Sequence, residues 1–133
     1  MAEQQLTAKG IVGGVRAALE SADLDAISEL LDPNVRWGAP DDPDQACQNR
    51  QQVLAWYRQR REAGVRAHVT ETAVYGDQIL VGLAVTGRLT VKEADTQANR
   101  WQVLTVGGGG IVEICGFDSR EEAVARAATG LAR

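Results

Sequence analysis

The segment from Ile79 to Thr86 most constrains the fold, because almost all of its residues are apolar. Successive side chains of a strand point to opposite faces of the sheet. One face would carry Val81, Leu83 and Val85, and the other would carry Leu80, Gly82 and Ala84. Such a strand must be covered on both faces, and helices can cover only one of them. We therefore expect a two-fold homodimer through the outer face of the sheet.

Helical and extended patterns follow one another in a clear order along the chain. The expected helices span residues 6–21, 24–31, 50–63 and 120–129, and the expected strands span residues 35–37, 65–75, 79–86, 101–106 and 111–117. Asp23 is expected to cap the second helix, and Ser119 begins a capping box for the last one. Three helices before a meander of four antiparallel strands predict an α+β fold, with helices on one face of a curved sheet.

Length and charge restrict the class of protein. The chain has 133 residues, of which 44% are apolar and 24% charged, and its net charge is −4. These values are typical of one globular domain, here residues 1–133. No apolar run is long enough to cross a membrane, and residues 1–5 do not resemble a signal peptide, so we expect a cytoplasmic protein. The acidic total disfavours nucleic-acid binding.

The cysteines and the single histidine argue against several chemistries. Cys47 and Cys115 are far apart and form no CxxC motif, so we expect two reduced thiols. His68 is the only histidine, and a structural zinc site normally takes four Cys or His ligands. A catalytic triad would need His68, but no GxSxG motif accompanies it. We therefore predict neither a metal nor a cofactor, and strand alternation places His68 on the outer face of the sheet.

Several local signatures resemble the NTF2-like superfamily, and within it the SnoaL-like group. The signatures are ADLD at 22–25, LLDPNV at 30–35, the helix start from Asn49-Arg50 to Trp56, and GIVEI at 110–114. The resemblance covers essentially the whole chain and implies a cone: a strongly bent antiparallel sheet around the N-terminal helices, with a pocket at the wide end. Members of the superfamily include ketosteroid isomerase-like enzymes, polyketide cyclases, epoxide hydrolase-like enzymes and non-catalytic binders.

The positions that carry catalytic groups in such enzymes are replaced here. Ketosteroid isomerase-like members use a carboxylate base, a tyrosine and a protonated acid. The resemblance places these positions at Trp37, Val15 and Trp101, and it places the last-strand aspartate of other members at Gly116. Because indole offers one N–H donor and no base, the isomerase proton shuttle cannot operate with these residues.

Aromatic side chains are the candidates for lining a ligand pocket. The resemblance places Trp37, Trp56 and Trp101 near the interior of the cone. Tyr57 follows Trp56 on the third helix, and Ile114 shares the strand phase expected to face the pocket. Indole walls suit a flat or cyclic apolar ligand. The alternative is that these side chains simply fill the core.

Two carboxylates are candidates for a general base. Asp118 follows the last strand in the phase of Ile114 and Gly116, which would place it at the mouth of the pocket. Glu71 shares the phase of Val69, so it too can point inward. Desolvation beside indole would raise the pKa of either group, as a base requires. The alternatives are helix capping for Asp118 and a solvated position beyond a β-bulge for Glu71.

Four arginines lie near the aromatic residues of the third helix. They are Arg58, Arg60, Arg61 and Arg66, and we interpret them as a solvated face because the chain is acidic; the alternative is an anion-binding patch with Trp56 and Tyr57. The sequence as a whole predicts a small-molecule pocket protein for an apolar cyclic substrate, with cofactor-free isomerase, cyclase or lyase activity. The alternative is a non-catalytic ligand-binding or dimerisation module on the same fold.

Overall fold

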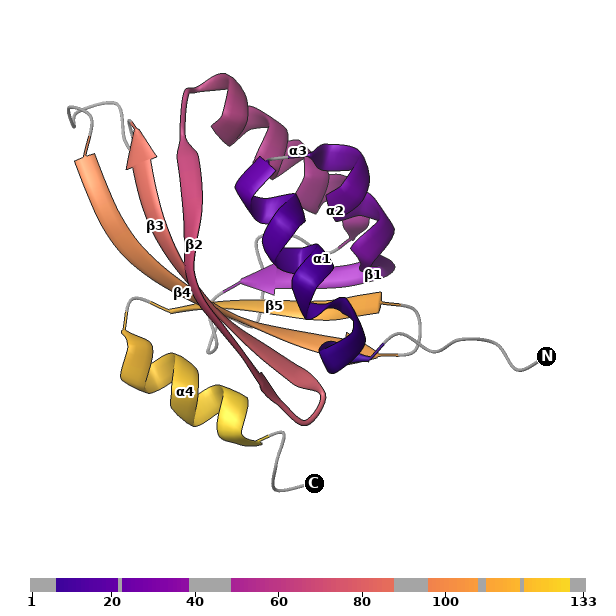
Figure 1. The fold of residues 1–133 in the computed structure, drawn as a ribbon. Helices are drawn as coiled ribbons and strands as arrows, with labels where there is room; N and C mark the ends of the chain where they lie inside the picture. The colour runs from indigo at the N-terminus through magenta and orange to yellow at the C-terminus, as the bar shows by residue number, and fades with distance from the viewer. Residues whose placement is uncertain are drawn as a thin grey trace.

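The computed structural model describes residues 7–21, 23–38, 49–87, 96–107, 110–117 and 119–129, and the expected α+β fold is confirmed (Figure 1). The helices are α1 (Ala8–Ser21), α2 (Leu24–Leu30), α3 (Arg50–Glu62) and α4 (Arg120–Ala128). The strands are β1 (Leu31–Gly38), β2 (Arg66–Tyr75), β3 (Gln78–Gly87), β4 (Thr96–Gly107) and β5 (Gly110–Phe117). They form one five-stranded sheet in the order β1-β5-β4-β3-β2.

Side-chain caps fix where two of the helices begin. The carboxylate of Asp23 accepts hydrogen bonds from the backbone N–H groups of Asp25 and Ala26, which confirms the predicted cap of α2. Asn49 caps α3 by accepting from the N–H of Gln52 at 2.9 Å. Ser119 precedes α4, but its side chain makes no capping hydrogen bond, so the predicted capping box is wrong.

The sheet is mixed, because β1 pairs in parallel with β5 while β2 to β5 form the expected antiparallel meander. β1 is longer than predicted and continues through Pro33, which lies where the register with β5 shifts. Proline is tolerated there because β1 is an edge strand. β4 also begins earlier than predicted, at Thr96. Gly76 adopts φ 61° in the β2–β3 turn, as a tight hairpin requires.

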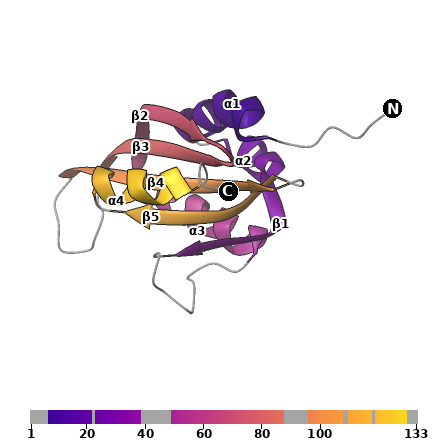
Figure 2. The same cartoon turned by 90° about the horizontal axis from the view of Figure 1, so that it is seen from below.

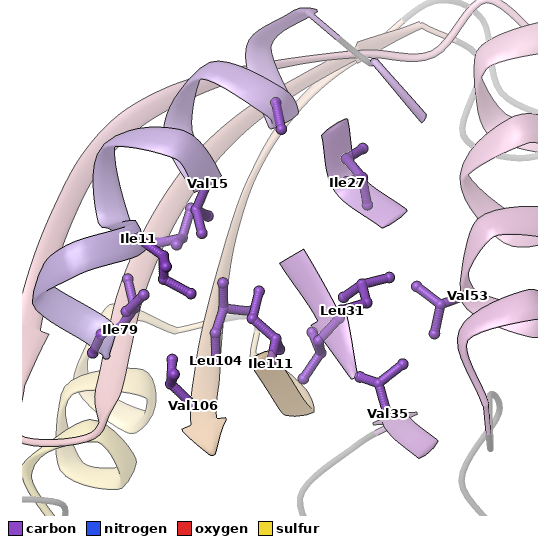
Figure 3. Close-up of a cluster of buried hydrophobic side chains, with 14 of the residues drawn as sticks. Ile11, Val15, Ile27, Leu31, Val35, Val53, Ile79, Leu104, Val106 and Ile111 are labelled. Carbon is purple, nitrogen blue, oxygen red and sulfur yellow. The ribbon is translucent and has the colours of Figure 1, made fainter. Parts of the chain in front are cut away.

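Helices α1, α2 and α3 cover the concave side of the curved sheet (Figure 1). The main core lies between them, where Val15, Ile27 and Val53 meet Leu104 and Ile111 from the sheet (Figure 3). All five side chains are buried.

Helix α4 packs on the opposite, convex side of the sheet (Figures 1 and 2). Leu80 is fully buried there with Val103, beneath Ala123 and Ala127 of α4. The expectation that all helices lie on one face is therefore wrong, since the chain itself covers much of the apolar outer face. The homodimer through the sheet stays a prediction, but the exposed patch that motivated it is largely absent.

Candidate functional site

A cavity of about 640 Å³ lies on the concave side of the sheet. Its apolar and aromatic lining comprises Leu19, Leu24, Ile27, Trp37, Trp56, Tyr57, Val65, Ala67, Leu83, Val85, Trp101 and Phe117. These residues come from α1, α2, α3, all five strands and the turn before β2, so helices border the cavity on one side and strands on the other. Its volume falls in the range of ligand sites, which is roughly 300–1,000 Å³.

Three aromatic side chains form one wall of the cavity. The ring centroids of Trp37 and Trp56 are 4.4 Å apart, and Tyr57 lies 5.2 Å from Trp37 and 5.6 Å from Trp56. The guanidinium of Arg60 stands over the Trp56 ring at 4.7 Å from its centroid. We call Trp37, Trp56 and Tyr57 the aromatic wall. It presents rigid apolar surface suited to a flat ring.

Arginines surround the cavity where α3 leads into β2. Arg60 and Arg61 come from the last turn of α3, Arg66 begins β2, and Arg100 faces them from β4. Arg66 is held by two backbone carbonyls, because its Nη1 donates to those of Arg61 and Val65. The interpretation of these arginines as only a solvated face is incomplete, since three of the four also border the cavity.

Gln102 is a site residue that the sequence analysis missed. It lies on the inner face of β4, is 8% exposed and borders the cavity. Its Oε1 is buried without a hydrogen-bond partner in the part of the chain that the structure describes. Gln102 also borders a smaller void of about 20 Å³, together with Val15 and Ile114. A signal was present, because Gln102 is the one amide in the otherwise apolar stretch 101–104.

Glu71 does not face the cavity, so the inward orientation considered for it is wrong. Val69 pairs with Leu83 and Glu71 pairs with Gly82, which leaves Thr70 as the extra residue of a β-bulge. The bulge turns Glu71 to the convex side, where its carboxylate accepts two hydrogen bonds from Arg120, at 2.7 and 3.1 Å. This interaction lowers the pKa of the Glu71 carboxyl, the opposite of the change expected for a desolvated base.

Trp101 shares the convex environment of Glu71. Its Nε1 donates to Glu71 Oε1 at 3.4 Å, and its ring packs with the cluster beneath α4. Trp101 also borders the cavity, but its indole does not join the aromatic wall as the resemblance implied. Ile114 is buried on the concave side, and Gly116 borders the cavity with open space where a Cβ would stand.

The remaining candidates lie outside the cavity or outside the described residues. Asp118 and Cys47 belong to the latter group. The exposed His68 side chain contacts α1, with its Nδ1 at 3.3 Å from Glu20 Oε1, and it does not line the cavity. Glu20 is the single carboxylate in the described lining.

Within the described ranges, no three His, Cys, Asp or Glu side chains gather as a metal-binding group. No helix in those ranges has the length and apolar character needed to cross a membrane.

Residues 12–114, well over half of the chain, match the family described as the SnoaL-like domain. The chain belongs to this family. The match confirms the resemblance that the local signatures carried. No curated protein sequence matches the chain.

Solved structures agree with this SnoaL-like assignment. A proposed polyketide cyclase from Sinorhizobium meliloti is 25% identical with a TM-score of 0.62, over 80% of this chain and 93% of that one. A proposed SnoaL-like polyketide cyclase from Jannaschia sp. CCS1 is 17% identical with a TM-score of 0.69, and the match covers 97% of this chain and 98% of that one. A protein of ketosteroid isomerase-like fold from Catenulispora acidiphila, solved in complex with trimethylamine, is 16% identical with a TM-score of 0.64. The match covers 92% of this chain and 94% of that one. The last two share the fold.

Proposed function

We propose that this SnoaL-like protein binds a flat, cyclic, mainly apolar small molecule in the concave cavity. The observation that carries the proposal is the aromatic wall of Trp37, Trp56 and Tyr57 beside about 640 Å³ of space. Stacking against such a wall favours a planar ring over a flexible chain. Family membership adds support, because SnoaL-like relatives include proposed polyketide cyclases.

Intrinsic tryptophan fluorescence tests this binding function. The protein is titrated with a panel of steroids, terpene epoxides and polyketide-like aromatic compounds. We expect saturable quenching by at least one class, and a smaller quenching amplitude in Trp37→Phe. Tyr75→Phe is the matched control, since Tyr75 packs with the convex cluster and does not border the cavity, and it should retain the response. The absence of saturable quenching by every class would contradict the proposal.

Catalysis of a cofactor-free isomerisation, cyclisation or elimination is a second candidate function. Its support is the phase of β5, since Ile114 lies on the concave side, Gly116 borders the cavity, and Asp118 follows two residues later. Asp118 would then act as the proton acceptor. Once a binding compound class is known, Asp118→Asn separates the two functions. Lost turnover with retained binding indicates an enzyme, whereas a protein that binds but shows no turnover in either form is a binder.

A further inference from the structure

The charges and the buried amide of the cavity restrict its ligand more narrowly than the aromatic wall does. The described lining carries the guanidinium groups of Arg60, Arg61, Arg66 and Arg100, and the one carboxylate of Glu20. This carboxylate already has a positive neighbour, because Arg16 Nε lies 3.9 Å from Glu20 Oε1. A cavity edged in this way favours an anionic group on its ligand.

The arginines are not explained by helix capping alone. Arg60 and Arg61 lie in the last turn of α3, where cations favourably meet the negative end of the helix dipole. Arg66 also meets that helix end, because it donates to the carbonyl of Arg61, whereas Arg100 belongs to β4. Two strands and one helix thus bring guanidinium groups to the same opening. Arg61, Arg66 and Arg100 are exposed, which places this positive region at the mouth of the cavity.

Gln102 marks the inner end of the same cavity. It is buried, it borders both the cavity and the small void behind it, and its Oε1 has no partner in the described ranges. A buried acceptor without a hydrogen bond is costly, so a group that donates to it is favoured. Open space at the neighbouring Gly116, which pairs with Gln102 across β4 and β5, leaves room for that group.

We propose that the cavity selects ring compounds that carry a carboxylate at the arginine-lined mouth and a hydrogen-bond donor at the inner end, where Gln102 accepts from it. The ring itself lies against the aromatic wall. This inference rests on the proposed binding function and adds polarity and orientation to it. The carboxylate class follows from the planar, forked geometry of guanidinium, which matches two carboxylate oxygens.

Three probes of nearly the same shape test the two ends separately by isothermal titration calorimetry. The probes are 6-hydroxy-2-naphthoate, its amide 6-hydroxy-2-naphthamide, and 6-methoxy-2-naphthoate. The amide removes the charge, and the methoxy compound removes the donor. We expect the hydroxy acid to bind about tenfold more tightly than either analogue at low ionic strength. The preference over the amide should shrink as salt is added, because exposed charges are screened.

Variants assign each preference to its residues. The double variant Arg61→Gln/Arg100→Gln should bind the hydroxy acid and the amide with equal affinity. Arg58→Gln is the matched control, since Arg58 is an exposed arginine of α3 that does not border the cavity, and it should keep the preference. Gln102→Met keeps the approximate side-chain shape and should bind the hydroxy and methoxy acids equally. Thermal unfolding followed by circular dichroism confirms that each variant is folded.

The outcomes separate this inference from the proposed function. If the amide and the hydroxy acid bind equally well to the unaltered protein, the charge selection is overturned while ligand binding stands. If Gln102→Met preserves the preference for hydroxyl over methoxy, the inner-end assignment is overturned, as expected if a water in the small void satisfies Gln102 instead. If none of the three probes binds, the inference is overturned, and the fluorescence panel alone decides whether the proposed binding function stands.

Discussion

The two sides of the sheet differ in how tightly they are filled. On the convex side, α4 packs on the strands through Ala123 and Ala127, and the side chains of Leu80 and Val103 beneath it are fully buried. On the concave side, α3 presents Trp56, Tyr57 and Arg60 toward the sheet, and a cavity of about 640 Å³ remains. Small residues let a helix approach a sheet, whereas large aromatic residues hold it away. The convex face is therefore closely packed, whereas the concave face carries both the main core and the cavity.

Ion pairs reinforce the convex side. Arg120 at the start of α4 binds Glu71 of β2, and Arg126 near its end binds Glu113 of β5 at 2.7 Å. The helix is thus tied to two strands that are not neighbours in the sheet. Between these ties, burial raises the pKa of the Cys115 thiol, which keeps it protonated near neutral pH.

The largest expected effect is a contrast in stability between two leucines. Leu80→Ala removes a fully buried side chain from the convex cluster and should lower the free energy of unfolding by about 3 kcal/mol. Leu24→Ala, at a partly buried position that borders the cavity, should cost about 1 kcal/mol, since space already lies beside it. Urea denaturation measures both values. Equal losses at the two positions would contradict the difference in packing.

The next effect is on ligand binding. Gly116→Leu adds a side chain where a Cβ meets nothing within 4 Å, so the fold should tolerate it. The new side chain fills part of the cavity beside Gln102, and affinity for a ring compound that binds the unaltered protein should fall at least about tenfold. Calorimetry measures the affinity, and urea denaturation shows that stability is kept. Full affinity in this variant would place the ligand elsewhere.

A smaller effect concerns the tie between β2 and α4. Glu71→Gln should lower the free energy of unfolding at pH 7 by about 1 kcal/mol, the scale of a partly exposed, bidentate pair. Because the Arg120 hydrogen bond lowers the pKa of Glu71 in the folded state, the stabilisation is present above the unfolded value of about 4.3. It is lost as the pH falls through the lowered value.

Urea denaturation of both proteins between neutral and acidic pH measures this difference. The two stability curves should converge at the acidic end, where the carboxylate is protonated. Ligand affinity should be unchanged, since Glu71 lies on the convex side. If Glu71→Gln keeps its stability but loses ligand binding, the assignment of Glu71 to the convex side is contradicted, and the residue contributes to the cavity instead.

The smallest expected effect is a change in stability at an exposed glycine of α1, which packs neither in the convex cluster nor in the cavity. Gly13 is exposed within α1, and a Cβ there meets nothing within 4 Å. Gly13→Ala should therefore raise the free energy of unfolding by roughly 0.5 kcal/mol. Gly10→Ala is the matched control, because its Cβ would stand 2.9 Å from Thr7 Oγ1, and it should gain less. A larger gain at Gly10 would contradict the local geometry of α1.

Most of the fold followed from the sequence, because helical and strand periodicities are local properties. The facing of the β2 side chains could not be predicted beyond Val69. The bulge at Thr70 adds one residue, which turns Glu71 and every later residue of β2 to the other face. The alternation of Val65, Ala67 and Val69 contains no sign of it. The structure does contain the β-bulge that the sequence analysis gave as the alternative for Glu71.

The candidate site was predicted only in part. Trp37 and Trp56 line the cavity, as the family resemblance implied, and Tyr57 lines it beside them. The arginine-lined mouth depends on Arg100 meeting α3 across the fold, and spacing along the chain cannot predict such a meeting. Gln102 was visible as a polar residue in an apolar strand, but the absence of a partner for its amide oxygen appears only in three dimensions.

The most direct test of the account follows the indole N–H groups by ¹⁵N NMR during a titration with 6-hydroxy-2-naphthoate. The chain has three tryptophans, and single Trp→Phe variants assign their three resonances. The signals of Trp37 and Trp56 should shift with a common affinity and by more than that of Trp101, whose ring borders the cavity but whose N–H donates to Glu71 on the convex side. A larger shift at Trp101 than at Trp37 and Trp56, or no shift at all, would contradict a ligand that lies against the aromatic wall.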